Sequence, residues 1–193
     1  MPACCKFIKS YASGHNTTPF QERTHDQHNL HHVYSRLQAN AGRSKRGFAQ
    51  SRNPCFRQKI DPNALLQARL FPDMFNLLRQ VQVASDFAKS VSARLAGVDV
   101  PKMDDNEQTF ADLQTRIDTV MTFIGGLDQG KFDQAATREI ITQAGTPKEK
   151  RFTGQSYLLN YGLPHFFFHT TTAYSILRHN GVEVGKKDYI GTY

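Results

Sequence analysis

Residues 73–97 read DMFNLLRQVQVASDFAKSVSARLAG, and this stretch decides the fold. Asp73 can accept the first backbone N–H groups as an N-cap, and Gly97 suits a helix end because glycine tolerates left-handed backbone. Between them, apolar side chains recur at helical spacing, at Phe75, Leu78, Val81, Ala88, Val91 and Leu95. The pattern predicts a long amphipathic helix from Pro72 to Ala96 with one face in a core.

Two more segments carry the same helical spacing. The first follows Asp105, a suitable N-cap, and ends at Gly125-Gly126; its apolar positions are Phe110, Leu113, Ile117, Val120, Met121 and Ile124. The second begins after Thr153, another N-cap residue, and runs to about His179. Three long amphipathic helices with short connections predict an all-α fold, an antiparallel helical bundle.

Shorter elements are expected around these helices. Asp61 followed by Pro62 indicates a helix start, because Asp is a good N-cap and Pro fits the first turn. Pro72 would end or kink that helix. Before the last long helix, residues 139–142 and 150–152 flank the turn residues Gly145-Thr146-Pro147, a pattern typical of a small β-hairpin.

The basicity of the chain resides in its first sixty residues. The full sequence carries a net charge of +7. Residues 1–60 hold ten Lys and Arg against two acids, a balance of +8, whereas residues 61–193 hold fourteen against fifteen, a balance of −1. The predicted bundle therefore lacks the positive surface that nucleic-acid binding requires, and we expect no nucleic-acid partner.

Residues 1–59 do not fit the bundle. They show no sustained helical or strand period, and they are poor in Val, Ile and Leu. Such a segment cannot bury enough apolar surface to offset an ordering cost of roughly 1–2 kcal/mol per residue. We interpret residues 1–59 as a disordered or mis-translated segment and place the bundle domain at residues 60–193. The bundle would then lack its first helix.

The cysteines and the hydropathy pattern predict a cellular location. All three cysteines, Cys4, Cys5 and Cys55, lie before the bundle, so the bundle can form no disulfide, which fits a reducing cytoplasm. No apolar run approaches the roughly 20 residues of a membrane helix, and no signal-peptide core follows the N-terminus. We expect a cytoplasmic protein with no membrane partner.

Several blocks of the sequence carry a family resemblance. They include Arg94-Leu95-Ala96-Gly97-Val98, Phe152-Thr153-Gly154, Phe168-His169 and Thr171-Thr172-Ala173-Tyr174. With them, residues 60–193 resemble the DUF1993 family of unknown function, a relative of the DinB/YfiT-like helical bundles. The resemblance implies a DinB-like antiparallel four-helix bundle with a small β-hairpin before the last helix. It also implies no established activity and, as is common among bundle relatives, a homodimer.

The resemblance also bears on residues 1–59. Family members begin with a short start segment, a Tyr and the first long helix, and this sequence has the basic segment instead. Reading the possible codons of His32 to Gln58 one nucleotide on permits a family-like start. We therefore hypothesise that the segment is an out-of-frame translation, which sequencing of the transcript and the genomic locus at this junction would test.

His165 and His169 are the candidates for metal chemistry. They lie four residues apart on the last helix, so both imidazoles face the same way, and neutral imidazoles are ordinary ligands of zinc or nickel. DinB-like relatives that bind metal add a third His from an earlier helix. Here that helix offers no His, and Asp86 is the candidate third ligand. In the alternative interpretation His169 is a buried, hydrogen-bonded core residue and His165 a tolerated variant.

The aromatic side chains of the last helix also allow two interpretations. They are Phe166, Phe167, Phe168, Tyr157, Tyr161 and Tyr174. Such a stripe can line a ligand pocket, but on a helix it more often forms the core of the bundle.

Two hypotheses of function follow. The first is an uncharacterised, non-catalytic or oligomeric bundle protein that needs no cofactor. The alternative is a metal-dependent enzyme like the DinB-related thiol transferases, with zinc or nickel held by His165, His169 and Asp86. Both hypotheses share one fold, so the sequence leaves open whether the protein is an enzyme.

Overall fold

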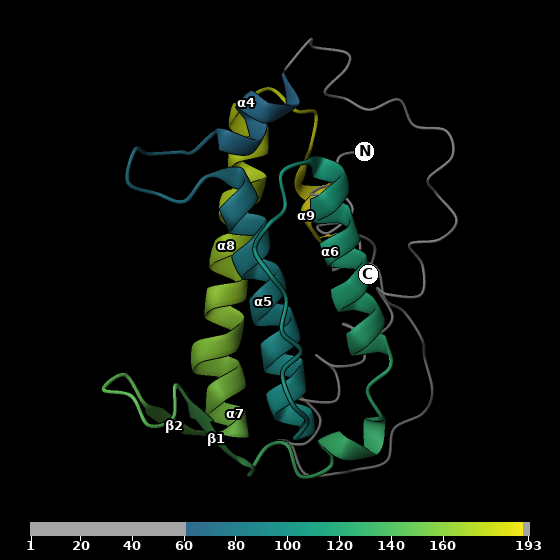
Figure 1. Ribbon diagram of the computed structural model, residues 1–193, viewed down its shortest axis with the longest axis vertical. Helices are drawn as coiled ribbons and strands as arrows, with labels where there is room; N and C mark the ends of the chain where they lie inside the picture. The colour runs from purple at the N-terminus through teal and green to yellow at the C-terminus, as the bar shows by residue number, and fades with distance from the viewer. Residues whose placement is uncertain (1–60, 191–193) are drawn as a thin grey trace.

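The computed structural model describes residues 61–190, in which three long helices run along one axis of the molecule (Figure 1). α5 (Leu77–Ala96) packs against both α8 (Leu163–His179) and α6 (Phe110–Gly125), and it stands between them in Figure 1. As predicted, the described fold is mostly helical, with a two-stranded antiparallel hairpin ahead of the last long helix. The prediction for residues 1–59, with its missing first helix, lies outside the described residues.

The predicted start of α5 was wrong by several residues. Its N-cap is Asn76, whose side chain accepts a hydrogen bond from the backbone N–H of Arg79 at 2.9 Å. Asp73 and Phe75 therefore precede the helix, and the Phe75 ring is 51% exposed. Asp and Asn are similarly good caps, and a start at Leu77 places that side chain fully in the core. Tertiary packing thus selects between two caps that the sequence offers.

The N-cap of α6 also lies later than predicted. It is Thr109, whose hydroxyl accepts from the backbone N–H of Asp112 at 3.2 Å, while the Asp112 carboxylate accepts from the Thr109 N–H at 2.9 Å. This reciprocal pair is a capping box. Asp105, the predicted cap, instead pairs with Arg79 and Arg116. The connection between α5 and α6 is consequently longer than expected.

The shorter elements were predicted more closely. α4 (Pro62–Gln67) begins at Asp61 as expected and ends before Pro72. η1 (Gln129–Phe132) follows α6, and α9 (Lys186–Ile190) closes the described chain. The hairpin consists of β1 (Glu139–Thr142) and β2 (Lys150–Thr153), in a register that places Glu139 opposite Thr153.

The last helical run contains a turn that the sequence did not predict. Thr153 caps α7 (Gly154–Tyr157) as expected, but a π-helical turn, η2 (Leu158–Gly162), separates α7 from α8. A Cβ on Gly162 would lie 2.7 Å from a methyl carbon of Val91, and one on Gly154 would lie 1.7 Å from the carbonyl oxygen of Ala135. Both glycines therefore permit close approach of backbone to neighbouring segments.

Two apolar clusters hold these elements together. The larger one joins α4, α5, α6 and α8 around Leu77, Leu113 and Ile176. The smaller one packs the hairpin end of the molecule around Tyr157, whose side chain is fully buried. Within residues 61–190, no helix has the length and apolar character needed to cross a membrane.

Candidate functional site

A cluster of charges lies between α5, α6 and the loop that joins them, with some members buried and others partly exposed. At its centre, the side chain of Arg116 is only 1% exposed. Its Nη1 donates to a Glu107 carboxylate oxygen at 2.8 Å and to the carbonyl oxygen of Asp104 at 3.1 Å. Its Nη2 lies 2.8 Å from Asp86 and 3.1 Å from Asp105. One guanidinium therefore ties three carboxylates from two parts of the chain to α6.

Two further cations complete what we call the Arg116 cluster. Lys89 Nζ lies 3.0 Å from Asp86, and Arg79 pairs with Asp105. The cluster thus holds three cations and three carboxylates: Arg79, Lys89, Arg116, Asp86, Asp105 and Glu107. Every carboxylate in it faces a cation, so the charges of the buried members, Arg116, Lys89 and Glu107, are compensated.

The ionisation of the cluster follows from the balance between burial and pairing. Burial alone would raise the pKa of Glu107, but hydrogen bonds from Arg116 and Gln82 outweigh it and hold that pKa below its ordinary value. Burial works in the same way on Asp105, whose pKa is also lowered because it pairs with Arg79 and Arg116. Glu107 and Asp105 are therefore charged at neutral pH.

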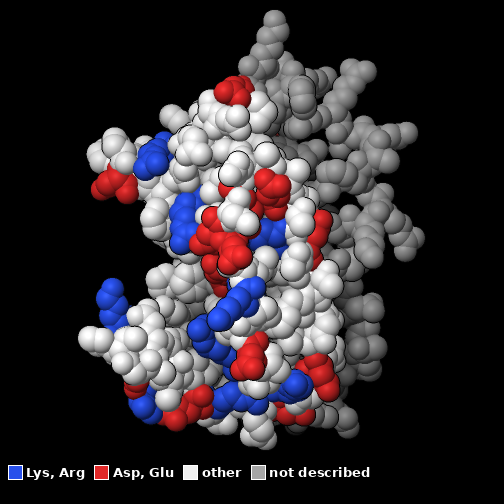
Figure 2. Space-filling view, viewed as in Figure 1, with Lys and Arg blue, Asp and Glu red and all other residues white. Residues whose placement is uncertain are grey.

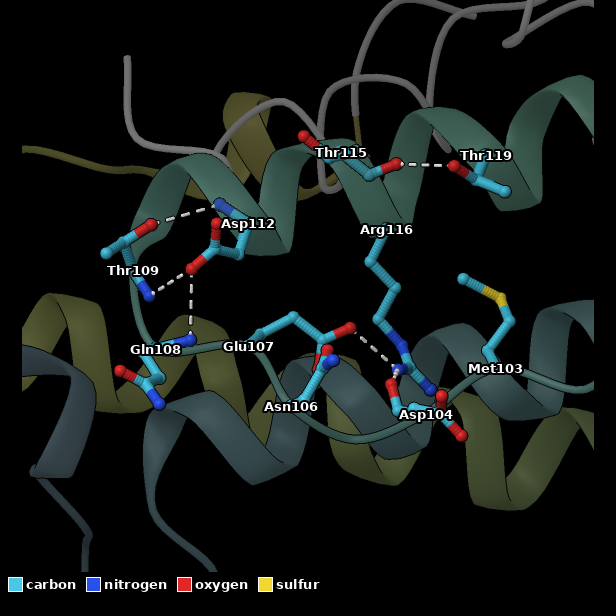
Figure 3. A pocket seen from close by; sticks show the side chains of 10 residues that line it. All are labelled: Met103, Asp104, Asn106, Glu107, Gln108, Thr109, Asp112, Thr115, Arg116 and Thr119. Carbon is cyan, nitrogen blue, oxygen red and sulfur yellow. Dashed lines mark hydrogen bonds and ion pairs between the residues drawn. The ribbon is translucent and has the colours of Figure 1, made fainter.

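A polar pocket of about 560 Å³ lies beside this cluster, between α6 and the loop before it (Figure 3). Arg116 reaches from the helix toward Glu107, while Asp112 turns back to its capping contact with Thr109 (Figure 3). The hydroxyl of Thr115 donates to a carbonyl oxygen of its own helix at 3.0 Å. The capping pair and Thr115 are satisfied by the fold itself, whereas Arg116 Nε is buried without a hydrogen-bond partner among the described residues.

Arg116 was not among the functional residues predicted from the sequence. A signal was present, because Arg116 lies three residues after Leu113 and directly before Ile117, on the buried stripe of α6. Arginine is rarely buried unless it is paired. A charged residue beside an apolar stripe, with acids in the preceding loop, would therefore have indicated a buried ion-pair cluster.

His169 is a buried residue of the bundle. It is 8% exposed, and its Nδ1 lies 2.8 Å from the Gln80 side-chain oxygen, across the contact between α8 and α5. Burial lowers the pKa of His169 to about 4, and the charges of His165 and Arg79 act in the same direction. The imidazole is consequently neutral at pH 7.

His165 and Asp86, the other predicted metal ligands, have different surroundings. The His165 ring stacks on Phe87 with a centroid distance of 4.6 Å, and burial followed by the charge of Lys150 lowers its pKa. Asp86 belongs to the Arg116 cluster. Over residues 61–190, no three His, Cys, Asp or Glu side chains form a group that could hold a metal ion. The metal site therefore remains a prediction, because among the described residues Asp86 does not form such a group with the two histidines.

Four large apolar side chains are exposed around the α4–α5 loop and α8. They form what we call the aromatic patch, Leu70, Phe71, Phe75 and Phe168. Phe71 is 62% and Phe168 57% exposed, and the rings of Phe75 and Phe168 both lie against His169, at centroid distances of 6.4 and 5.2 Å. Exposed apolar groups that gather in this way are typical of interaction surfaces.

A second cavity, of about 520 Å³, lies at the other end of α5, between this helix, the loop after it and the Tyr157–Tyr161 segment. Arg94 donates to the Tyr157 hydroxyl at 3.1 Å, and burial raises the pKa of that hydroxyl. Of the aromatic residues singled out from the sequence, Tyr157 and Tyr161 line this cavity, whereas Phe166 lies in the core.

These features belong to a DinB-like helical bundle. The chain matches the crystal structure of a DinB family member protein from Shewanella denitrificans with a TM-score of 0.67 and 41% sequence identity. The match covers 87% of this chain and 86% of that chain. The described helices and hairpin thus have the architecture of a solved relative.

The family can be stated more narrowly. The family described as "Domain of unknown function (DUF1993)" matches residues 40–190, so the chain belongs to the DUF1993 family, which has no assigned function. The matched range begins before residue 60, the predicted start of the bundle domain. No curated protein matches the chain.

Proposed function

We propose that this chain is a non-catalytic bundle protein that works as a homodimer joined through the aromatic patch. The observation that carries the proposal is the exposure of Leu70, Phe71 and Phe75 before α5 and of Phe168 on α8, where the rings of Phe75 and Phe168 both lie against His169. A twofold pairing would place each patch against its own copy, because twofold interfaces use the same surface on both subunits. Removing these side chains from water favours association.

The Arg116 cluster supports the non-catalytic part of this proposal. Asp86, Asp105 and Glu107 each pair with the same arginine, so their charges are used to join α5, α6 and the loop. A general base needs a carboxylate that can reach a substrate proton. We further propose a cytoplasmic location without a nucleic-acid partner, from the absence of cysteine in residues 61–193 and the −1 charge balance there.

Sedimentation velocity of the full chain tests the dimer. The expected result is a species of about twice the monomer mass of 21.9 kDa at micromolar concentration. A Phe71→Ser, Phe168→Ser double variant should be monomeric, because it removes the two most exposed rings of the patch. The matched control is Leu159→Ser, which changes an exposed apolar residue outside the patch and should leave the dimer intact. A monomeric wild-type chain would refute the proposal.

One observation favours the metal-dependent alternative. His165 and His169 are both neutral at pH 7, as metal coordination requires, because their pKa values are lowered. Metal analysis after purification in the presence of zinc or nickel discriminates the two functions. One equivalent of metal that is lost in His169→Ala and kept in His179→Ala supports a metal enzyme, whereas a metal-free dimer ends that alternative.

A further inference from the structure

The cavity at the end of α5 has an aromatic wall. Phe87, Tyr157 and Tyr161 all line it. The ring centroids of Tyr157 and Tyr161 are 5.6 Å apart with nearly parallel planes, and those of Phe87 and Tyr161 are 5.9 Å apart. The π-helical turn η2 begins directly after Tyr157 and includes Tyr161. Tyr157 is fully buried behind this wall, so the apolar surface that a ligand could contact belongs to the half-buried Phe87 and Tyr161.

The cavity also collects positive charge. Lys89, Arg94 and Lys102 line it, against the carboxylates Asp86 and Asp104. Asp86 is already shared between Lys89 and Arg116. Figure 2 shows acidic side chains grouped near the middle of this face of the molecule, with Lys and Arg side chains beside and below them.

The cations are not fully compensated when the cavity and the neighbouring Arg116 cluster are counted together. The cations are Arg79, Lys89, Arg94, Lys102 and Arg116, and the carboxylates are Asp86, Asp104, Asp105 and Glu107. Five positive groups thus stand against four negative ones in the two features together, and three against two in the lining of the cavity itself. This excess of one positive charge would be balanced by one negative charge on a ligand.

Lys89 is a buried cation of the cavity that can accept a further partner. It is 5% exposed, and its ammonium carries three N–H donors. Within the described residues its ion-pair partner is the single carboxylate of Asp86. A buried ammonium is stabilised by each additional acceptor that it gains. A carboxylate bound in the cavity could supply that acceptor.

We propose that this cavity binds a small aromatic carboxylate. The aromatic surface of Phe87 and Tyr161 would hold the ring, and Lys89, Arg94 and Lys102 provide the cations for the carboxylate. The volume of about 520 Å³ lies within the range usual for small-molecule sites, about 300–1,000 Å³. A single negative charge matches the excess of one cation, whereas a phosphate dianion would exceed it. The site is independent of the proposed dimer.

Fluorine NMR of 4-fluorobenzoate with the full chain tests the site. The expected result is a saturable shift or broadening of the fluorine signal with a Kd on the order of 1 mM or tighter, as suits a ligand of this size. The uncharged analogue 4-fluorobenzyl alcohol should bind at least about fivefold more weakly, because it lacks the carboxylate. No binding of 4-fluorobenzoate at about 10 mM, or equal binding of the alcohol, overturns the proposal.

Two pairs of variants place the ligand in this cavity. Lys102→Gln should weaken binding about fivefold, while Lys148→Gln, which removes an exposed lysine of the hairpin loop, should not. Tyr161→Leu should weaken it about fivefold and Tyr161→Phe should retain it, because the ring face and not the hydroxyl makes the contact. Thermal melts show that each variant is folded. Equal affinities of the members of either pair overturn the proposed site.

Discussion

The two sides of α5 accommodate buried polar groups in opposite ways. Toward α6, the buried Arg116 keeps its charge and is surrounded by three carboxylates at 2.8 to 3.1 Å. Toward α8, the buried His169 is neutral at pH 7, because its pKa is lowered to about 4. Its ring is hydrogen-bonded to the neutral amide of Gln80. Pairing and neutralisation are the two ways to lower the cost of a buried ionisable group.

Because of this difference, the stability of the two sides responds to different changes. An ion-pair cluster is vulnerable to removal of one partner, because the others are then left buried and uncompensated. A neutral histidine is instead vulnerable to acid, because protonation is easier in the unfolded chain than in the fold. The cavity at the end of α5 differs from both sides, because its cations outnumber its carboxylates.

The largest effect is expected for Arg116→Met. It leaves the buried Glu107 without its cation, while the partly exposed Asp86 and Asp105 keep Lys89 and Arg79, and we expect a loss of about 3 kcal/mol in the free energy of unfolding. Urea unfolding followed by circular dichroism measures it. Arg151→Met is the matched control, because Arg151 pairs with Glu139 and Glu149 at the exposed hairpin and its loss should leave the unfolding midpoint unchanged. Similar midpoints for both variants would show that the cluster contributes little.

An intermediate effect is expected from pH on the α8 side. In the unfolded chain His169 titrates near 6.5, and in the fold near 4, so between these values the unfolded state binds more protons and stability falls as pH falls. The contribution of His169 amounts to about 2–3 kcal/mol, fully present above pH 6.5 and lost by pH 4. Urea unfolding at a series of pH values measures it.

The comparison with a His169→Gln variant isolates this histidine. The variant should lose less stability than the wild type between pH 6.5 and pH 4. The α6 side behaves differently, since the lowered pKa values of Asp105 and Glu107 preserve their contribution until pH falls below their ordinary values of 3.8 and 4.5. Identical pH profiles for wild type and His169→Gln would contradict the assignment.

The smallest effect is expected for Lys89→Met, at about 1 kcal/mol or less. Asp86 keeps its pairing with Arg116 in this variant, and the methionine side chain fills most of the volume of the lysine stem. Asp86→Asn, in contrast, leaves the buried ammonium of Lys89 without its carboxylate and should cost more. Thermal melts of the two variants rank them, and the reverse order would show that Lys89 and not Arg116 anchors Asp86.

Much of the fold could be predicted because each helix carries its own periodic signal. The stripe from Leu113 to Ile124 and the cap at Thr153 were read from local sequence and lie where they were expected. The start of α5 was misjudged because Asp73 and Asn76 are both good caps, and only the burial of Leu77 separates them. When the sequence allows two N-caps for one helix, the packing of the first helical side chains against the core decides which cap is used.

The candidate site was harder to predict, because its members are distant in sequence. His165 and His169 satisfied the spacing for metal ligands, yet this spacing does not reveal that Gln80 bonds to one ring and Phe87 stacks on the other. The same limit applies to Arg116, whose carboxylate partners come from α5 and from the loop. Local spacing describes one helix face and says nothing about what the neighbouring helix presents to it.

The sequence by itself determined the class of fold, the hairpin at residues 139–153 and the concentration of basic residues before residue 61, because periodicity, turn residues and charge are local properties. The tertiary structure decided the pairing of Arg116, the neutrality of His169 and the cavity beside Tyr161. These depend on distances between helices and on exclusion of water, which exist only once the helices have packed. The positions of the helices can be predicted from the sequence, but the ion pairs, the protonation of His169 and the cavity depend on contacts between helices.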